Sequence, residues 1–160
     1  MRWTIVAAMG LMTGPAPEGA NAQDAQRPAE ARLYLFFSPA DRDLAALPGE
    51  VRRVLDGLEK KKGRVELRPV LLLADFKTVG TLHTNEAFFN LVKELCDLRG
   101  PEFELRLYDE EGLAWAEKLA IERTPAWALV TRDPKKNELR AHLVYGGRAK
   151  VEELMSCKTR

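Results

Sequence analysis

Blocks of apolar and polar positions divide the chain into alternating strands and helices. The continuous apolar run at 32–37 is typical of a strand buried on both faces, and so is the run that ends the segment 65–73. Strict alternation of apolar and charged residues predicts a half-buried strand at 103–107. Two further strands are predicted at 126–131 and 139–145, and their short connection makes them an antiparallel hairpin.

Apolar residues at helical spacing predict the helices between these strands. The first begins near Ala40, is capped by Ser38 or Asp41, and is expected to kink at Pro48–Gly49 or to be divided there into two short helices. Gly63 ends it, because a glycine tolerates the backbone of a helix C-cap.

Three more helices follow in the same way. An extra helix at about 85–98 is capped by Thr84 or Asn85, and the last helix spans 150–156. Between them, a helix starting at Asp109 is expected to bury one face, made of Leu113, Ala116, Leu119 and Ala120. The alternation predicts an α/β fold in which right-handed crossovers join parallel strands, a C-terminal antiparallel hairpin closes the mixed sheet, and helices flank both faces.

The N-terminus has the three features of an export signal. Arg2 precedes the apolar stretch 3–12, and Ala20-Asn21-Ala22 is a small-x-small cleavage pattern. We therefore expect 1–22 to be a signal peptide, 23–31 a flexible leader, and 32–160 one domain that works in the periplasm. The alternative is an uncleaved anchor or a disordered N-terminus, but 3–12 is too short to span a hydrocarbon core of roughly 30 Å.

Charge and motif content exclude several function classes. The formal net charge is +1, which argues against a nucleic-acid-binding surface. His83 and His142 have no metal-ligand spacing, and Gly146-Gly147 lacks the spacing and the lysine of a phosphate loop, so we expect neither a metal nor a cofactor. No segment after 1–22 is apolar enough to predict a membrane span.

One segment of the second half carries a resemblance. In 119–130, a helix ends at an aliphatic residue, a short turn follows, and Thr124-Pro125 enters an apolar strand. This stretch resembles the thioredoxin-like superfamily. The resemblance implies a cis-proline at Pro125, lying beside the start of the helix that follows the first strand, where redox members carry Cys-x-x-Cys and bind extended polypeptide.

The residues at that junction cannot perform dithiol chemistry. Ser38, Pro39, Ala40 and Asp41 stand where the cysteine pair would be, and no Cys-x-x-Cys occurs anywhere in the chain. We therefore predict that Ser38, Pro39, Ala40 and Asp41, together with Thr124 and Pro125, form a partner-binding face without a catalytic residue.

Within that superfamily the chain is most similar to the TrbC family of F-type conjugative pilus assembly proteins. The similarity rests on 34–41 and on 107–113 followed by 121–126. It implies a periplasmic, non-enzymatic assembly factor of a conjugative pilus or type IV secretion system, whose partners are other secretion or pilus assembly proteins. The methionine usual before the first proline is absent, and Val-Pro is Thr-Pro here.

Two cysteines leave a second function open. Cys96 and Cys157 are even in number, which permits one disulfide in an oxidising compartment. The alternatives are a buried, inert Cys96 and a reactive Cys157. The alternative function is accordingly a thiol-based redox enzyme or chaperone that uses Cys157 or the Cys96/Cys157 pair.

Overall fold

The computed structural model describes residues 31–73, 82–99, 105, 109–133 and 135–156. The predicted signal peptide, nearly all of the leader, most of the predicted strand at 103–107, and Cys157 lie outside these residues. Within them, Ala31 already belongs to the first strand, one residue before the predicted apolar run at 32–37. None of the described helices is both long and apolar enough to cross a bilayer.

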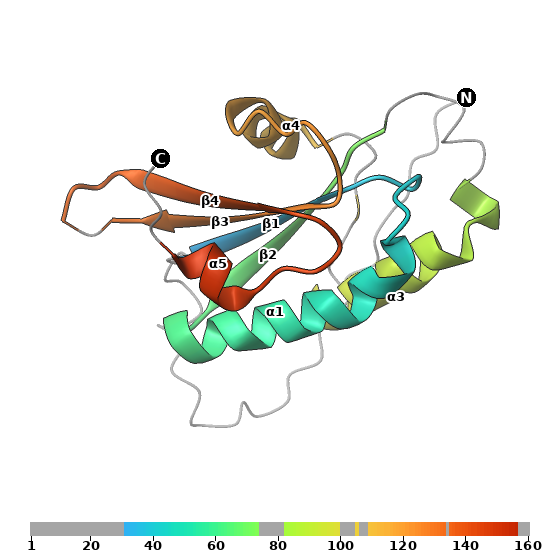
Figure 1. The fold of residues 1–160 in the computed structure, drawn as a ribbon, viewed down its shortest axis with the longest axis horizontal. Helices are drawn as coiled ribbons and strands as arrows, with labels where there is room; N and C mark the ends of the chain where they lie inside the picture. Colours follow the sequence, from blue (N-terminus) through green and yellow to red (C-terminus); the bar gives the residue numbers. More distant parts are fainter. Residues whose placement is uncertain (1–30, 74–81, 100–104, 106–108, 134, 157–160) are drawn as a thin grey trace, which may run out of the picture.

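Strands and helices follow one another nearly as the pattern predicts (Figure 1). Their order is β1 (Ala31–Phe37), η2 (Leu44–Ala46), α1 (Leu47–Lys62), β2 (Val65–Leu71), η3 (Leu82–Thr84), α3 (Glu86–Arg99), α4 (Glu110–Lys118), β3 (Ala126–Arg132), β4 (Leu139–Tyr145) and α5 (Val151–Met155).

The four strands form one mixed sheet in the order β2-β1-β3-β4. β1 pairs in parallel with β2, and β3 and β4 form the predicted antiparallel hairpin. β3 runs antiparallel to β1, however, so the expected parallel crossover is confirmed between β1 and β2 but not between β1 and β3. The crossover rule applies only when two strands point the same way, and the connection through α4 returns the chain in the opposite direction.

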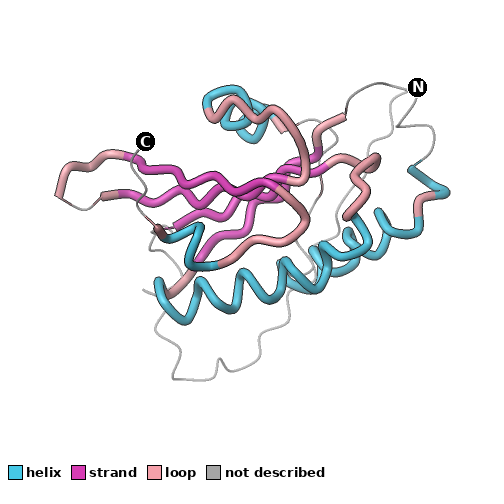
Figure 2. The backbone as a smooth tube through the Cα atoms, in the orientation of Figure 1, coloured by secondary structure: helices cyan, strands magenta, loops and turns pink. Residues whose placement is uncertain are grey.

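The sheet separates two layers of helices (Figures 1 and 2). α1, α3 and α5 cover one face, and α4 covers the other. Alternate residues of β1 serve the two layers: Leu33, Leu35 and Phe37 join the core beneath α1, whereas Tyr34 and Phe36 join the core beneath α4. This explains why the run 32–37 is apolar almost throughout.

The start of α1 differs from the prediction. The helix begins at Leu47, after the 3-10 turn η2, and Pro48 occupies its first turn. A proline there leaves no intrahelical hydrogen bond unmade, so Pro48–Gly49 does not kink the helix. Of the two alternatives, the structure has two separate helices, η2 and then α1. The predicted end is confirmed, with Gly63 at a φ of 79°.

The residues that directly precede α3 and α4 cap these helices with their side chains. Asn85 Oδ1 accepts the Phe88 N–H at 3.0 Å, and Asp109 Oδ1 accepts the Gly112 N–H at 3.1 Å. Both are the N-cap contacts that these residue types favour. Of the two predicted caps for α3, the structure therefore selects Asn85.

The contact face of α4 is rotated from the predicted one. Gly112, Trp115, Ala116 and Leu119 approach the sheet, whereas Ala120 is exposed. Gly112 allows this approach because a Cβ there would lie only 2.6 Å from a Val70 methyl carbon. The spacing of apolar side chains cannot indicate a contact made by a glycine, so the close approach at Gly112 was not predicted.

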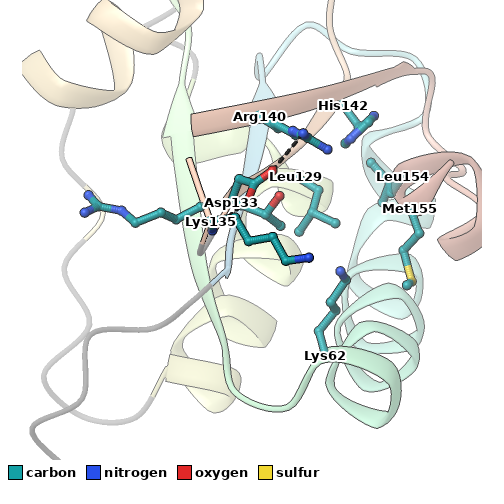
Figure 3. A pocket seen from close by; sticks show the side chains of 10 residues that line it. Lys62, Leu129, Asp133, Lys135, Arg140, His142, Leu154 and Met155 are labelled. Carbon is teal, nitrogen blue, oxygen red and sulfur yellow. Dashed lines mark hydrogen bonds and ion pairs between the residues drawn. The ribbon is translucent and has the colours of Figure 1, made fainter. Parts of the chain in front are cut away.

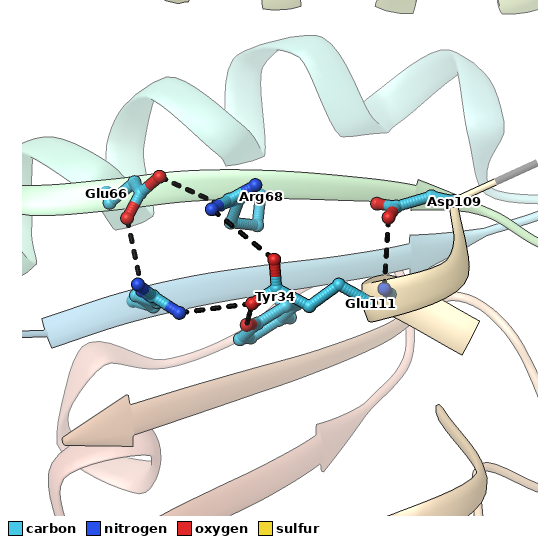
Figure 4. A network of polar contacts seen from close by, with 7 residues as sticks. Tyr34, Glu66, Arg68, Asp109 and Glu111 are labelled. Atoms are coloured by element: carbon cyan, nitrogen blue, oxygen red, sulfur yellow. Dashed lines mark hydrogen bonds and ion pairs between the residues drawn. The ribbon is translucent and has the colours of Figure 1, made fainter. Parts of the chain in front are cut away.

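Ion pairs also connect α4 with the sheet (Figure 4). Arg32 contacts Glu66 and Glu111, each at 3.1 Å, and Arg68 contacts Glu66 at 2.8 Å. The Tyr34 hydroxyl donates to Glu111 at 3.4 Å, and burial raises the pKa of Tyr34. These pairs are partly exposed, so they orient α4 more than they stabilise it.

We predict that Gly112→Ala destabilises the protein by about 1–3 kcal/mol, because the new methyl group collides with Val70. Gly49→Ala is the matched control, since a Cβ at Gly49 meets nothing within 4 Å. It should raise stability by about 0.4–1 kcal/mol. Urea unfolding measures both, and equal effects of the two variants would contradict the close approach of α4 to β2.

Candidate partner-binding face

The segment 38–41 leaves the sheet directly after β1. Ser38 is buried, with 8% of its surface exposed, and its Oγ accepts the Ala40 N–H at 3.3 Å. The Asp41 N–H donates to the Ser38 carbonyl at 3.0 Å, and Asp41 Oδ2 accepts the Ser38 N–H at 2.7 Å. The turn thus satisfies its own polar groups and leaves Ala40 exposed.

Neither Ser38 nor Asp41 caps a helix, which corrects the prediction. η2 follows Asp43, and α1 follows Ala46, each without a side-chain cap. The two candidate caps are used within the turn because Asp41 reaches back to the chain that leaves β1.

Asp41 also connects this turn to the start of β3. The Thr124–Pro125 peptide bond is cis, as the resemblance implied. The Thr124 hydroxyl donates to Asp41 Oδ1 at 2.5 Å. One carboxylate therefore joins two segments that are 83 residues apart, and the predicted face comes together around it.

The residues that follow β4 hydrogen-bond to the start of β3 and so hold the cis-proline in place. The Gly146 N–H donates to the Pro125 carbonyl at 2.8 Å, and the Trp127 indole N–H donates to the Gly146 carbonyl at 2.9 Å. A Cβ at Gly147 would lie 2.5 Å from Asp43 Cβ, so only glycine lets the chain pass here. Gly146-Gly147 was considered above only as a phosphate loop and excluded, although two adjacent glycines are a signal of a close approach.

Two more groups, neither of them predicted for the site, contact the segments that border it. Asn85 Nδ2 donates to the Pro39 carbonyl at 2.9 Å, so the cap of α3 also holds the turn. The Arg123 guanidinium lies 5.1 Å from the centre of the Tyr145 ring, and the Tyr145 hydroxyl accepts the Glu122 N–H at 3.4 Å. The exposed Arg123 therefore has a defined position beside Thr124.

The site presents no thiol among the residues described. Cys96 is half-buried on α3, about 15 Å along the helix axis from Glu86, and forms no disulfide with any residue described. Cys157 lies outside the described residues, so the predicted Cys96–Cys157 disulfide stays a prediction. His83 is exposed in η3 and His142 lies on β4; within the described ranges neither donates to or accepts from Ser38, and no cluster of three potential metal ligands occurs.

The fold is thioredoxin-like, as the strand order, the strand directions and the cis-proline at the start of β3 indicate. The turn at its site contains an aspartate and no thiol. No protein-family model matches the chain, and no curated protein is significantly similar to it. Among solved structures it is similar to that of MTB dsbF in its mixed oxidized and reduced forms, with a TM-score of 0.42 and 20% identity over 79% of this chain and 76% of that chain. A likeness this distant carries no argument about function.

We predict that Thr124→Val destabilises the protein by about 1.5–3 kcal/mol, because it removes a hydrogen bond to a charged carboxylate. Thr131→Val is the matched control, a half-buried threonine at the far end of β3. It should change stability by no more than about 0.5 kcal/mol. If both variants unfold at the same denaturant concentration, the Asp41–Thr124 contact contributes nothing to stability.

The two roles of Asn85 can be separated by hydrogen exchange. Asn85→Asp keeps the oxygen that accepts the Phe88 N–H but removes the donor to Pro39, so we expect faster exchange at the Ala40 N–H and unchanged exchange at Phe88. Asn85→Ala should accelerate both. Unchanged exchange at Ala40 in both variants would show that Asn85 does not hold the turn.

Proposed function

We propose that this protein is a non-catalytic thioredoxin-fold interaction protein. One observation carries the proposal: Asp41 bonds to both the Ser38 N–H and the Thr124 hydroxyl, at the place where redox members of the superfamily carry their cysteine pair. A carboxylate accepts hydrogen bonds but cannot form a mixed disulfide. The face can therefore bind a partner through hydrogen bonds but cannot exchange disulfides with it.

The chemistry around the cis-proline supports binding of an extended polypeptide. Ala40 is exposed and small, so a chain can approach the turn closely. Arg123 offers a positioned cation on the other side of Thr124. The superfamily resemblance implies that polypeptide binds along the backbone next to this proline, and a bound strand would add main-chain hydrogen bonds there.

We further propose a periplasmic setting and a role in assembling a conjugative pilus or type IV secretion system. The support is the predicted signal peptide at 1–22 and the similarity of 34–41, 107–113 and 121–126 to TrbC-family proteins. The proposed partners are other assembly proteins of that apparatus.

The thiol-based alternative has no comparable support in the described residues. Cys96 is half-buried on α3 and is not part of the face around Pro125. Thiol titration of the purified protein, with and without reductant, tests the alternative directly. A fast-reacting thiol together with turnover in an insulin-reduction assay would replace our proposal with a redox function.

We predict that a charged, bulky group at Ala40 abolishes function in cells. In a donor strain lacking the protein, Ala40→Arg should lower conjugative DNA transfer at least about tenfold relative to wild type, a loss of about 1.4 kcal/mol of partner binding. Ala141→Arg is the matched control, since Ala141 is also exposed but pairs with Val130 toward the other end of β3. A photo-crosslinking residue at 40, but not at 141, should capture a component of the secretion apparatus.

A cysteine-free variant separates binding from redox chemistry in the same strain. Cys96→Ser combined with Cys157→Ser should restore transfer to the wild-type level, because the proposed face contains no thiol. Failure of this folded variant, or normal transfer by Ala40→Arg, would contradict the proposal.

A further inference from the structure

A pocket of about 380 Å³ lies at the end of the sheet opposite the cis-proline. Its position follows from strand register: Thr131, in its wall, pairs with Ala31 at the beginning of β1, whereas Ala126 pairs with Phe36 near the end of β1. The end of α1, the β3–β4 hairpin and α5 supply the lining (Figure 3). The volume is within the range of about 300–1,000 Å³ that is typical of small-molecule sites.

The floor of this pocket is apolar. Leu129 and Leu154 belong to the core beneath α1, with exposed fractions of 1% and 0%. The half-buried Met155 packs against this core and, with the aliphatic stem of Lys62, supplies the apolar surface that a ligand can reach. Thioether and aliphatic side chains adapt to apolar groups of varied shape. A ligand that reaches the floor therefore needs an apolar part.

The rim is cationic. Lys62, Lys135 and Arg140 line it, and Figure 3 shows the ammonium groups of Lys62 and Lys135 pointing into the pocket. Cross-strand pairing places Arg140 opposite Thr131, and His142 opposite Leu129, so β4 presents two nitrogen-bearing side chains beside the same opening. Like charges that converge on one volume favour an anion between them.

The one carboxylate in the lining already takes part in an ion pair and in two backbone hydrogen bonds. Asp133 Oδ2 contacts Arg140 Nη2 at 2.7 Å, and Asp133 Oδ1 accepts the backbone N–H groups of Lys135 and Lys136 at 2.9 and 3.3 Å. It shapes the hairpin turn and orients Arg140. In the part of the chain that the structure describes, Lys62 and Lys135 form no ion pair, whereas the neighbouring Lys61 contacts Glu152 at 3.0 Å.

We propose that this pocket binds a small amphiphilic anion. Its headgroup, a phosphate or another compact oxyanion, would lie between Lys62 and Lys135, and its apolar part would cover Met155 and the aliphatic stems of the two lysines. Neither half of the pocket is sufficient alone: the cations attract the headgroup, and the floor excludes water from the apolar part. This inference does not depend on the proposed partner-binding function.

Octyl phosphate is the probe, titrated into the full chain and followed by calorimetry and by amide chemical shifts. We expect one saturable site, with shifts at Thr131, Arg140 and His142. Inorganic phosphate and octyl glucoside each carry half of the chemistry, so both should bind at least about tenfold more weakly. Equal binding of either half-probe, or binding that does not saturate, would overturn the proposal.

Charge reversal on one helical turn supplies a matched pair of variants. Lys62→Glu should weaken octyl phosphate at least about tenfold, whereas Lys60→Glu, with the same net charge outside the lining, should change its affinity less than about twofold. Lys135→Glu provides a second test on the hairpin, with a circular dichroism melt as the folding control for all three. Equal weakening by Lys60→Glu and Lys62→Glu would mean unspecific attraction and would reject the site.

Free amphiphiles and membrane lipids share this chemistry. Sedimentation with phosphatidylglycerol vesicles distinguishes them. Binding to vesicles that Lys62→Glu abolishes assigns a lipid headgroup as the source, and octyl phosphate binding without vesicle binding assigns a soluble amphiphile.

Discussion

The structure depends on the burial of both faces of β1. This strand lies between β2 and β3, and its alternate side chains enter two separate cores. A strand covered on both faces leaves little room for charged side chains, and the one charged residue of β1, Arg32 near its start, is ion-paired, so polar groups gather where the strand ends. Ser38 is the first residue beyond β1, and the cis-proline begins the neighbouring strand at the same edge. The site is thus a consequence of where the buried strand stops.

At that edge, the carboxylate of Asp41 performs a structural task. Hydrogen bonds to an ionised group contribute about 1.5–3 kcal/mol each, roughly twice a neutral bond. Asp41 accepts one from Ser38 within its own turn and one from Thr124, 83 residues away. A thiol pair at this place would accept hydrogen bonds weakly and react readily. An aspartate cannot exchange disulfides, but its hydrogen bonds fix the geometry of the turn. Fixed geometry reduces the conformational entropy that a binding surface loses on association.

Sequence patterns predicted what local chemistry determines. The apolar runs located all four described strands, and the residue types at Asn85 and Asp109 indicated the starts of α3 and α4. What depends on contacts far along the chain was missed: the direction of β3, the use of Asp41 across 83 residues, and the approach of Gly112 to Val70. No periodicity encodes these features, because each requires two segments to be placed together first.

β3 runs from the partner-binding face to the cationic pocket, and its length separates the charges of the two sites. Its first residue follows the cis-proline, and Thr131 lies in the cationic pocket, about 17 Å further along the strand. This separation is about twice the Debye length of roughly 8 Å at physiological ionic strength. Solvent-exposed charges at the two ends of β3 are therefore largely screened from each other, and in the lining only Asp133 offsets the positive field of Lys62 and Lys135. Since Asp133 is held by Arg140 and by two backbone N–H groups, the field of the two lysines remains available to an external anion.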